Sequence, residues 1–313
     1  MPCIRSVGQE TNREQRIIVV GVGLPAPKAV SVIARRSFDQ RSNLQKVDGL
    51  LRSPAYCGVA RNDIRVIKKM DKYKIYLEVD RKGCCMAHIR ELPGCFVWDR
   101  TQKKVLERVP EIIKGYLSFL KKNGEKNASV PKKIEYEIME TQKGTCPVIS
   151  GSKAALFSYD LLPPAKAFIN QCIRWMGYNR KELLKKVGKL SDEILDWKPE
   201  KKVRSIRETL YHVANCDLWY LSRLKDFKEL YAVSEYPKEK IFEKLKGNRE
   251  LAIKILRNLS PEDRNKINIP RKWAKYKDEK WTAGKMLRRF LEHEREHMGT
   301  IDKTLVLYRK SIA

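Results

Sequence analysis

Long apolar runs and paired cysteines are both missing from this chain of 313 residues. No apolar run approaches the roughly 18 residues that cross a bilayer, and the best candidate, residues 17–24, stops at Pro25. No A-x-A-like cleavage site follows it cleanly, so we do not expect a signal peptide. None of the eight cysteines belongs to a C-x-x-C pair, the spacing typical of thiolate metal sites. We expect reduced thiols, a cytoplasmic location and no membrane partner.

Acidic residues are scarce, because 38 Asp and Glu stand against 66 Lys and Arg and leave a formal net charge of +28. Such an excess favours nucleic acid as a partner, since Lys and Arg release counterions from phosphates. Here, however, basic and acidic residues alternate, as in KELLKK at residues 181–186 and KEKIFEKLK at residues 238–246. This alternation is typical of solvated helix faces. Nucleic acid therefore stays open as a partner without being favoured.

The first 69 residues differ in composition from the rest, with nine Arg against four Lys, whereas Lys prevails afterwards. Regular patterning begins at Met70, which leaves two explanations open. Residues 1–69 are either a basic extension or an over-extended reading frame whose natural start is Met70. The segment also contains a G-x-G-x-x-A motif at residues 21–26. Pro25 interrupts the helix start that would bind a pyrophosphate, so no dinucleotide cofactor is expected.

Residues 70–148 predict a small α+β domain. Short alternating segments bounded by turn residues indicate strands, and a longer run with apolar residues at helical spacing indicates a helix. The expected strands are 74–79, 85–89, 96–98 and 134–138, and the expected helix is 101–123. The order is therefore βββαβ.

One stretch of this domain carries a family resemblance. Residues 87–120 read AHIRELPGCFVWDRTQKKVLERVPEIIKGYLSFL, with an L-P-G-C turn and Thr101 at the helix start. This stretch resembles the HicB-type domain. The resemblance implies an antitoxin-type module that occludes a small mRNA-cleaving toxin, usually beside a DNA-binding tail. Because no such tail is visible in this chain, we expect a module that binds a protein or a ligand.

Residues 149–313 predict an all-α domain after a linker that contains Gly144 and Gly151. Four long segments have apolar residues at helical spacing, and polar connectors separate them. The expected helices are 161–187, 205–224, 236–259 and 282–308. Helices of this length with such connectors pack as a four-helix bundle. The fold class is therefore α+β, with the small βββαβ domain followed by the bundle.

Histidine is rare, with four in the chain, and three of them lie in the predicted bundle. His293 and His297 are four residues apart and leave the same face of the fourth helix, and His212 lies on the second. Three imidazoles in a bundle core suit one divalent ion, whether zinc, nickel, iron or manganese, with a coordination position left open. The spacing alone also permits core histidines bonded to backbone carbonyls. We expect His88, in the other domain, to be incidental.

A second resemblance bears on these histidines. Residues 190–199 (LSDEILDWKP), 205–224 (SIRETLYHVANCDLWYLSRL) and 287–302 (LRRFLEHEREHMGTID) are similar to the DinB/YfiT-type superfamily. The resemblance implies that His212, His293 and His297 coordinate a divalent ion. It also implies a metal-dependent transferase or hydrolase that acts on a small molecule, with a thiol as the leading substrate, and a HicB-like accessory domain. The alternative is a non-enzymatic, HicB-like regulatory or toxin-binding protein with a metal-stabilised bundle. A homodimer is left open.

Residues 293–297 also satisfy H-E-x-x-H, the zinc metalloprotease motif in which Glu294 would be the general base. That site needs a third ligand downstream, and no histidine follows His297. Thr300 also stands where the extended motif has glycine, so a protease is disfavoured.

Four further residues share helix faces with the three histidines, and none of them is assigned a catalytic role. Cys216 and Trp219 lie on the side of His212; Cys216 either approaches the metal or, as we expect, is a small buried apolar residue. Arg289 and Phe290 precede His293; Arg289 either holds an anionic substrate or, as we expect, lies at the surface.

Overall fold

The computed structural model describes residues 72–145, 154–231, 236–270, 276 and 278–312. The elements described below all belong to one compact unit, residues 58–199 and 203–313. The predictions for residues 1–69, including the start at Met70, lie outside the described residues. None of the described helices is long and apolar enough to cross a membrane.

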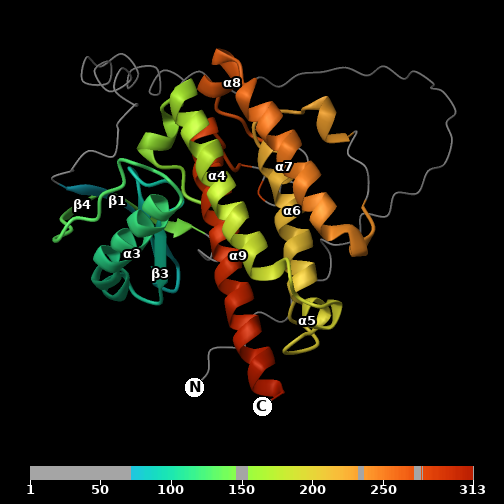
Figure 1. Ribbon diagram of the computed structural model, residues 1–313. Coiled ribbons are helices and arrows are strands. Elements are labelled where there is room, and N and C mark those ends of the chain that lie inside the picture. Colours follow the sequence, from blue (N-terminus) through green and yellow to red (C-terminus); the bar gives the residue numbers. More distant parts are fainter. Residues whose placement is uncertain (1–71, 146–153, 232–235, 271–275, 277, 313) are drawn as a thin grey trace, which may run out of the picture. The chain divides into compact units, whose positions relative to one another are not determined.

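The first elements of the described residues form a small mixed sheet with one helix, in the βββαβ order that the sequence predicts. Its elements are β1 (Tyr73–Asp80), β2 (Cys85–Ile89), β3 (Phe96–Asp99), α3 (Gln102–Lys122) and β4 (Tyr136–Thr145). The strand order is β3-β2-β1-β4, with β1 antiparallel to β2, β2 antiparallel to β3, and β4 parallel to β1. The helix α3 contacts β2 and β3 (Figure 1). The last strand begins two residues later than predicted and continues to residue 145.

Both faces of β1 are covered. Ile75 and Leu77 are fully buried in the core that α3 shares with the sheet. On the other face, Tyr76 packs against Ala155 and Phe157, which follow β4 in the chain. A strand buried on both sides does not need strict apolar and polar alternation. Glu78, on the same face of β1 as Tyr76, is accordingly buried as well.

After β4 the regular elements of the described residues are helices, apart from one isolated β-bridge, which confirms an α+β arrangement with a helical second part. They are α4 (Lys166–Val187), α5 (Asp192–Asp196), α6 (Ile206–Ser222), α7 (Ile241–Arg257), α8 (Pro261–Asn265) and α9 (Ala283–Ser311). The helix α6 contacts α7 and α9, and α4 contacts the same two helices (Figure 1). The four long helices therefore form a bundle around a shared interior.

The first long helix begins later than the sequence predicts. A short 3-10 helix, η1, occupies Ser158–Leu161, and α4 starts only at Lys166. Pro163 and Pro164 lie between the two, in residues without helical structure. The prediction that this helix begins at residue 161 was therefore wrong, because a proline disfavours helical geometry in the residue before it.

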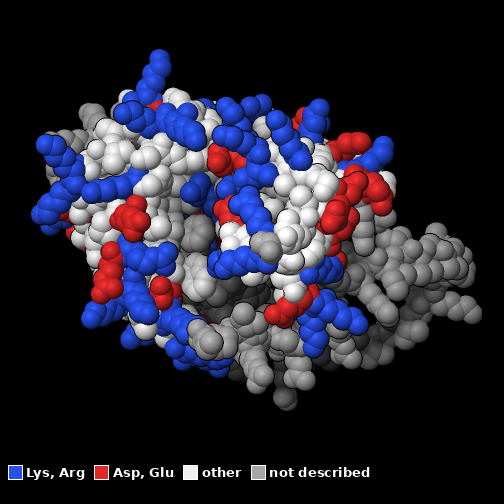
Figure 2. Space-filling model, turned by 60° about the horizontal axis from the view of Figure 1, so that its bottom comes forward, with Lys and Arg blue, Asp and Glu red and all other residues white. Residues whose placement is uncertain are grey.

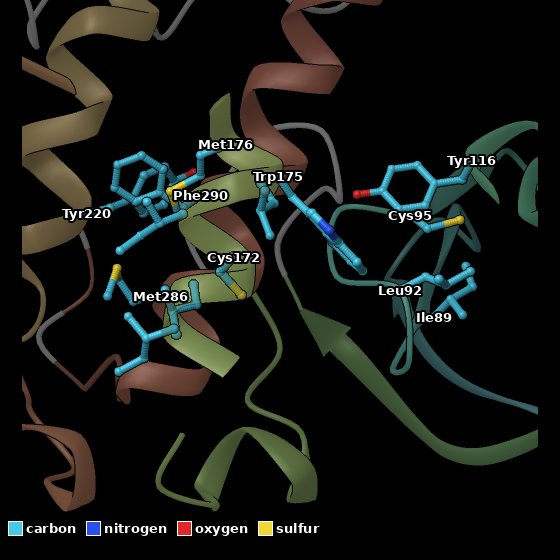
Figure 3. Packing of buried hydrophobic residues seen from close by; sticks show 14 of the residues in the cluster. Ile89, Leu92, Cys95, Tyr116, Cys172, Trp175, Met176, Tyr220, Met286 and Phe290 are labelled. Carbon is cyan, nitrogen blue, oxygen red and sulfur yellow. The ribbon is translucent and has the colours of Figure 1, made fainter. Parts of the chain in front are cut away.

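One continuous cluster of buried apolar side chains includes residues of the sheet, of α3 and of the bundle. Figure 3 shows Trp175 of α4 directed toward Tyr116 of α3, and their ring centroids are 6.0 Å apart. The cluster continues through Met176 of α4 to Tyr220 of α6 and Phe290 of α9 (Figure 3). The boundary near residue 148 stays a prediction, but the two segments share packed surface.

Charged side chains cover much of the visible surface in Figure 2, with Asp and Glu scattered among Lys and Arg. The ion pairs of the described residues include Lys186 with Asp302 at 2.8 Å and Lys198 with Glu208 at 2.7 Å. Exposed pairs of this kind contribute little to stability.

Candidate metal site

Three histidine side chains meet between α6 and α9. The Nε2 atom of His293 lies 3.1 Å from Nε2 of His212 and 3.0 Å from Nε2 of His297. One ligand atom from each of the three residues lies within 4.8 Å of the others. His293 is buried, whereas His212 and His297 are partly exposed. The structure therefore brings together the three residues that the sequence singles out.

Local sequence explains this meeting. Ser205 and Glu208 form a capping box at the start of α6. Ser205 Oγ accepts from the backbone N–H of Glu208 at 3.2 Å, and Glu208 Oε2 accepts from the backbone N–H of Ser205 at 3.0 Å. This cap starts α6 about two turns before His212. On α9, the four-residue spacing places His293 and His297 one above the other. Tyr220 of α6 packs against the ring of His293, with centroids 5.5 Å apart.

The three imidazoles are neutral at physiological pH. Burial, with the neighbouring His297, lowers the pKa of His212 to about 3. Burial and the cationic Arg204 and Arg289 lower the pKa of His297 to about 4, and burial holds the pKa of His293 well below its ordinary value. A neutral imidazole offers the lone pair that a metal ion requires.

This arrangement fits a divalent cation. A neutral imidazole nitrogen carries either one hydrogen or one lone pair, so His293 Nε2 can make a good hydrogen bond to only one of its two neighbours. One ion shared by the three nitrogens would satisfy all of them at once. Metal–nitrogen distances of about 2.0–2.1 Å at a tetrahedral ion place the ligand atoms about 3.3 Å apart, close to the two distances from His293 Nε2, 3.1 and 3.0 Å. Among the described residues, the group that could hold the ion consists of these three histidines.

Two of the predicted neighbours behave differently from expectation. Arg289 was expected at the surface, but it is 1% exposed and donates through Nη1 to Glu292 Oε2 at 2.9 Å. The sequence cannot show this, because a charged residue on a helix is normally solvated. Cys216 is partly exposed, and its Sγ lies 3.6 Å from Nε2 of His212. Burial raises the pKa of this thiol to about 12, so it stays protonated.

The acidic residue of the H-E-x-x-H motif faces away from the histidines. Glu294 is 2% exposed and accepts from Arg180 Nε of α4 at 2.6 Å and from Arg249 Nη2 of α7 at 3.0 Å. The same two arginines bind Asp217 of α6, at 3.2 and 3.0 Å. Each of the four long helices thus contributes one charge to a buried, balanced cluster. Glu294 is a structural residue of the bundle, and it is not available as a general base.

His88 does not join the three histidines, but it makes buried contacts that the sequence analysis did not predict. Its ring is fully buried between the carboxylates of Glu78, on β1, and Glu292, on α9. The sequence gives only a weak signal for this contact, since Glu78 interrupts an apolar strand and Glu292 lies 204 residues from His88.

Comparison with known proteins agrees with the geometry. A family model described as DinB superfamily matches residues 177–301, a range that contains all three histidines. Residues 177–301 are a DinB superfamily domain. Proteins of the DinB superfamily bind metal, and the histidine cluster of this domain could hold an ion.

A second comparison concerns a much shorter stretch. The chain is similar to the UPF0150 protein Ta0767 of Thermoplasma acidophilum, with 36% identity over 55 residues, which are 18% of this chain and 80% of that protein. By this coverage and identity the chain belongs, over those 55 residues, to the UPF0150 family. No solved structure matches the chain.

Proposed function

We propose that this DinB-like protein binds one divalent ion through His212, His293 and His297 and is a metal-dependent transferase or hydrolase for a small molecule. Zinc, nickel, iron and manganese all suit three imidazole ligands. The single observation that supports the proposal most strongly is the convergence of three neutral Nε2 atoms from two helices. A low-molecular-weight thiol is the substrate that we favour, and a cytoplasmic location goes with it.

Each of the three histidines and two neighbouring aromatic residues would have a separate role at the ion. His293, which is buried, would hold the ion from the interior, and the partly exposed His212 and His297 would hold it from the side that substrate can reach. Tyr220 packs against His293, and Phe290 packs against Tyr220; both rings are buried and would exclude water from the inner side. When bound, the cation lowers the pKa of a coordinated thiol or water and so supplies a nucleophile at neutral pH.

A second candidate function rests on the UPF0150 match and on the βββαβ order of the first segment, residues 73–145. In this alternative the segment is a HicB-like module that binds a protein partner, and the metal stabilises the bundle without catalysis. The two candidates differ in one measurable property, because only the first requires turnover at the ion.

The test compares the parent protein with His212→Gln, which has a similar side-chain volume and keeps α6 intact. Both are loaded with zinc, nickel, iron(II) or manganese and assayed on a panel of thiol-transfer and hydrolysis reactions. We expect turnover in the parent and a loss on the order of a hundredfold in His212→Gln, since a displaced ion orients substrate poorly. Lys303→Ala, on an exposed position of α9, is the control and should keep full activity.

Undiminished turnover in metal-depleted His212→Gln protein would rule out this mechanism. A parent protein that carries metal and has no activity on any reaction of the panel would favour the binding module. Thermal melting of each variant, with and without metal, separates loss of folding from loss of the ion.

A further inference from the structure

The imidazole of His88 lies between two carboxylates at the contact of the sheet with α9. Its Nδ1 atom is 2.7 Å from Glu292 Oε1, and its Nε2 atom is 3.0 Å from Glu78 Oε1. His88 and the two acids are each at most 2% exposed, so water cannot compensate any of these charges. The contact joins strands near the start of the described chain to the helix that carries two of the three metal-site histidines.

The geometry fixes the charge of this ring. A neutral imidazole has one N–H and one lone pair, so one of the two carboxylates would face a lone pair at close range. Only the imidazolium, with an N–H on each nitrogen, donates to both acids. Burial lowers the pKa of His88, and so does the cation of Arg288, whose Nη1 lies 3.3 Å from Nδ1. Glu292 and Glu78 more than offset both effects, so the pKa is raised above its ordinary value.

Charge balance in the surrounding cluster leads to the same conclusion. Arg288 pairs with Asp160 of η1 at 2.8 Å, and Arg289 pairs with Glu292 at 2.9 Å. With His88 protonated, three cations face three carboxylates among the side chains that are at most 4% exposed. The six are Glu78, His88, Asp160, Arg288, Arg289 and Glu292. Arg289 also lies 4.0 Å from the more exposed Glu296, which adds negative charge and so favours a protonated His88 further. A buried charge left without its partner is strongly destabilising, so the cluster requires every member.

Glu292 connects this cluster to the metal site. One of its oxygens accepts from His88, and the other accepts from Arg289 at 2.9 Å and lies 3.5 Å from Arg288. Both oxygens are thus held, and the next residue in the chain is His293. Because adjacent residues of a helix point about 100° apart, fixing Glu292 toward the sheet also fixes the direction in which His293 leaves α9.

We propose that His88 is a positioning residue of the histidine site: through Glu292 it fixes the turn of α9 that carries His293, and so it sets the affinity for the ion. The part about affinity rests on the proposed function, whereas the part about α9 does not. The first segment is then a structural support of the metal site, in addition to any partner that it binds.

The experiment uses the full chain and three variants. His88→Gln removes the charge and one donor. The double variant His88→Gln/Glu78→Gln removes one acid as well, so that two cations face two carboxylates and the new amide is free to donate to Glu292. Val105→Ala, in the core between α3 and the sheet, is a matched control that weakens the first segment without touching α9.

Two quantities are measured on each protein. Hydrogen exchange of the α9 backbone over residues 288–297 is followed in the metal-free protein, and zinc affinity is determined by competition with a chromophoric chelator. We expect faster exchange and about a tenfold loss of zinc affinity in His88→Gln, in line with losses at other supporting contacts of metal ligands. The double variant should regain both properties, and Val105→Ala should change neither beyond its effect on global stability.

Unchanged exchange in α9 of His88→Gln, or equal changes in Val105→Ala, would overturn the proposal. If the parent protein binds no zinc while His88→Gln still loosens α9, the proposed metal function fails and the positioning of α9 stands. If His88→Gln does not fold, the double variant decides, because failure to recover protected α9 there would contradict the role of charge balance.

Discussion

Glu294→Gln is the substitution that probes the bundle interior most directly. Glu294 accepts from Arg180 at 2.6 Å and from Arg249 at 3.0 Å, and the only other acid in the cluster is Asp217. Burial alone raises the pKa of Glu294, but Arg249 and Arg180 hold it below its usual range. The glutamine leaves two guanidinium groups against one carboxylate and turns an amide N–H toward one of them.

The size of the effect follows from that imbalance. Breaking a buried ion pair by removing one partner costs about 3–5 kcal/mol. For a folded unit of this size, about 2–4 °C is lost per kcal/mol, so we expect the melting temperature to fall by roughly 6–20 °C. The metalloprotease interpretation predicts the opposite pattern, in which Glu294→Gln folds normally and loses only activity.

The assay is urea unfolding of the metal-free protein at neutral pH, followed by circular dichroism. Glu250→Gln, at an exposed position one residue after Arg249, is the control and should stay within about 0.5 kcal/mol of the parent. A double variant with Arg180→Gln restores the charge balance and should recover part of the loss. A loss below about 1 kcal/mol in Glu294→Gln would refute the assignment of this residue to a buried cluster.

Three further predictions concern other parts of the chain. Gly94→Ala should lower the free energy of unfolding by about 2–5 kcal/mol, because Gly94 has φ +90° and an added Cβ would lie 2.8 Å from the hydroxyl of Tyr116. A variant that unfolds at the urea midpoint of the parent would contradict this. Ser205→Ala should cost about 1 kcal/mol through loss of the α6 cap, whereas Ser205→Asp should be nearly neutral by the same unfolding assay. The parent should exceed His88→Gln in free energy of unfolding by the largest amount below pH 6.5, the ordinary pKa of histidine. Because the pKa of His88 is raised in the folded protein, this difference should shrink as the pH rises from 6.5 toward the folded-state pKa. A difference that does not change with pH would exclude a titrating His88.

The sequence predicts most of the secondary structure because apolar periodicity and capping residues act locally. Helix α6 begins where Ser205 and Glu208 place it, and α9 begins after Thr282. The errors lie at boundaries that depend on the tertiary context. The strand β4 takes its limits from pairing with β1, with irregularities next to Ile75 and Val79 that no local pattern contains.

The candidate site shows the same division. Spacing on one helix places His293 beside His297, and family resemblance adds His212, so all three could be named from the sequence. The buried charges could not be named. Glu292 and Glu294 flank His293 with the same chemistry, yet one pairs with His88 and the other with Arg180. Which way each acid points is decided by partners more than 100 residues away.

Metal content of the purified full chain tests the central claim most directly. The protein is dialysed against zinc and then freed of excess metal, and bound metal is determined by elemental analysis for the parent, for His293→Ala/His297→Ala and for Lys303→Ala. We predict close to one divalent ion per chain in the parent and in Lys303→Ala, and loss of most of it in the double variant. Stoichiometric metal that survives the double substitution, or a parent protein that retains none, would contradict the account.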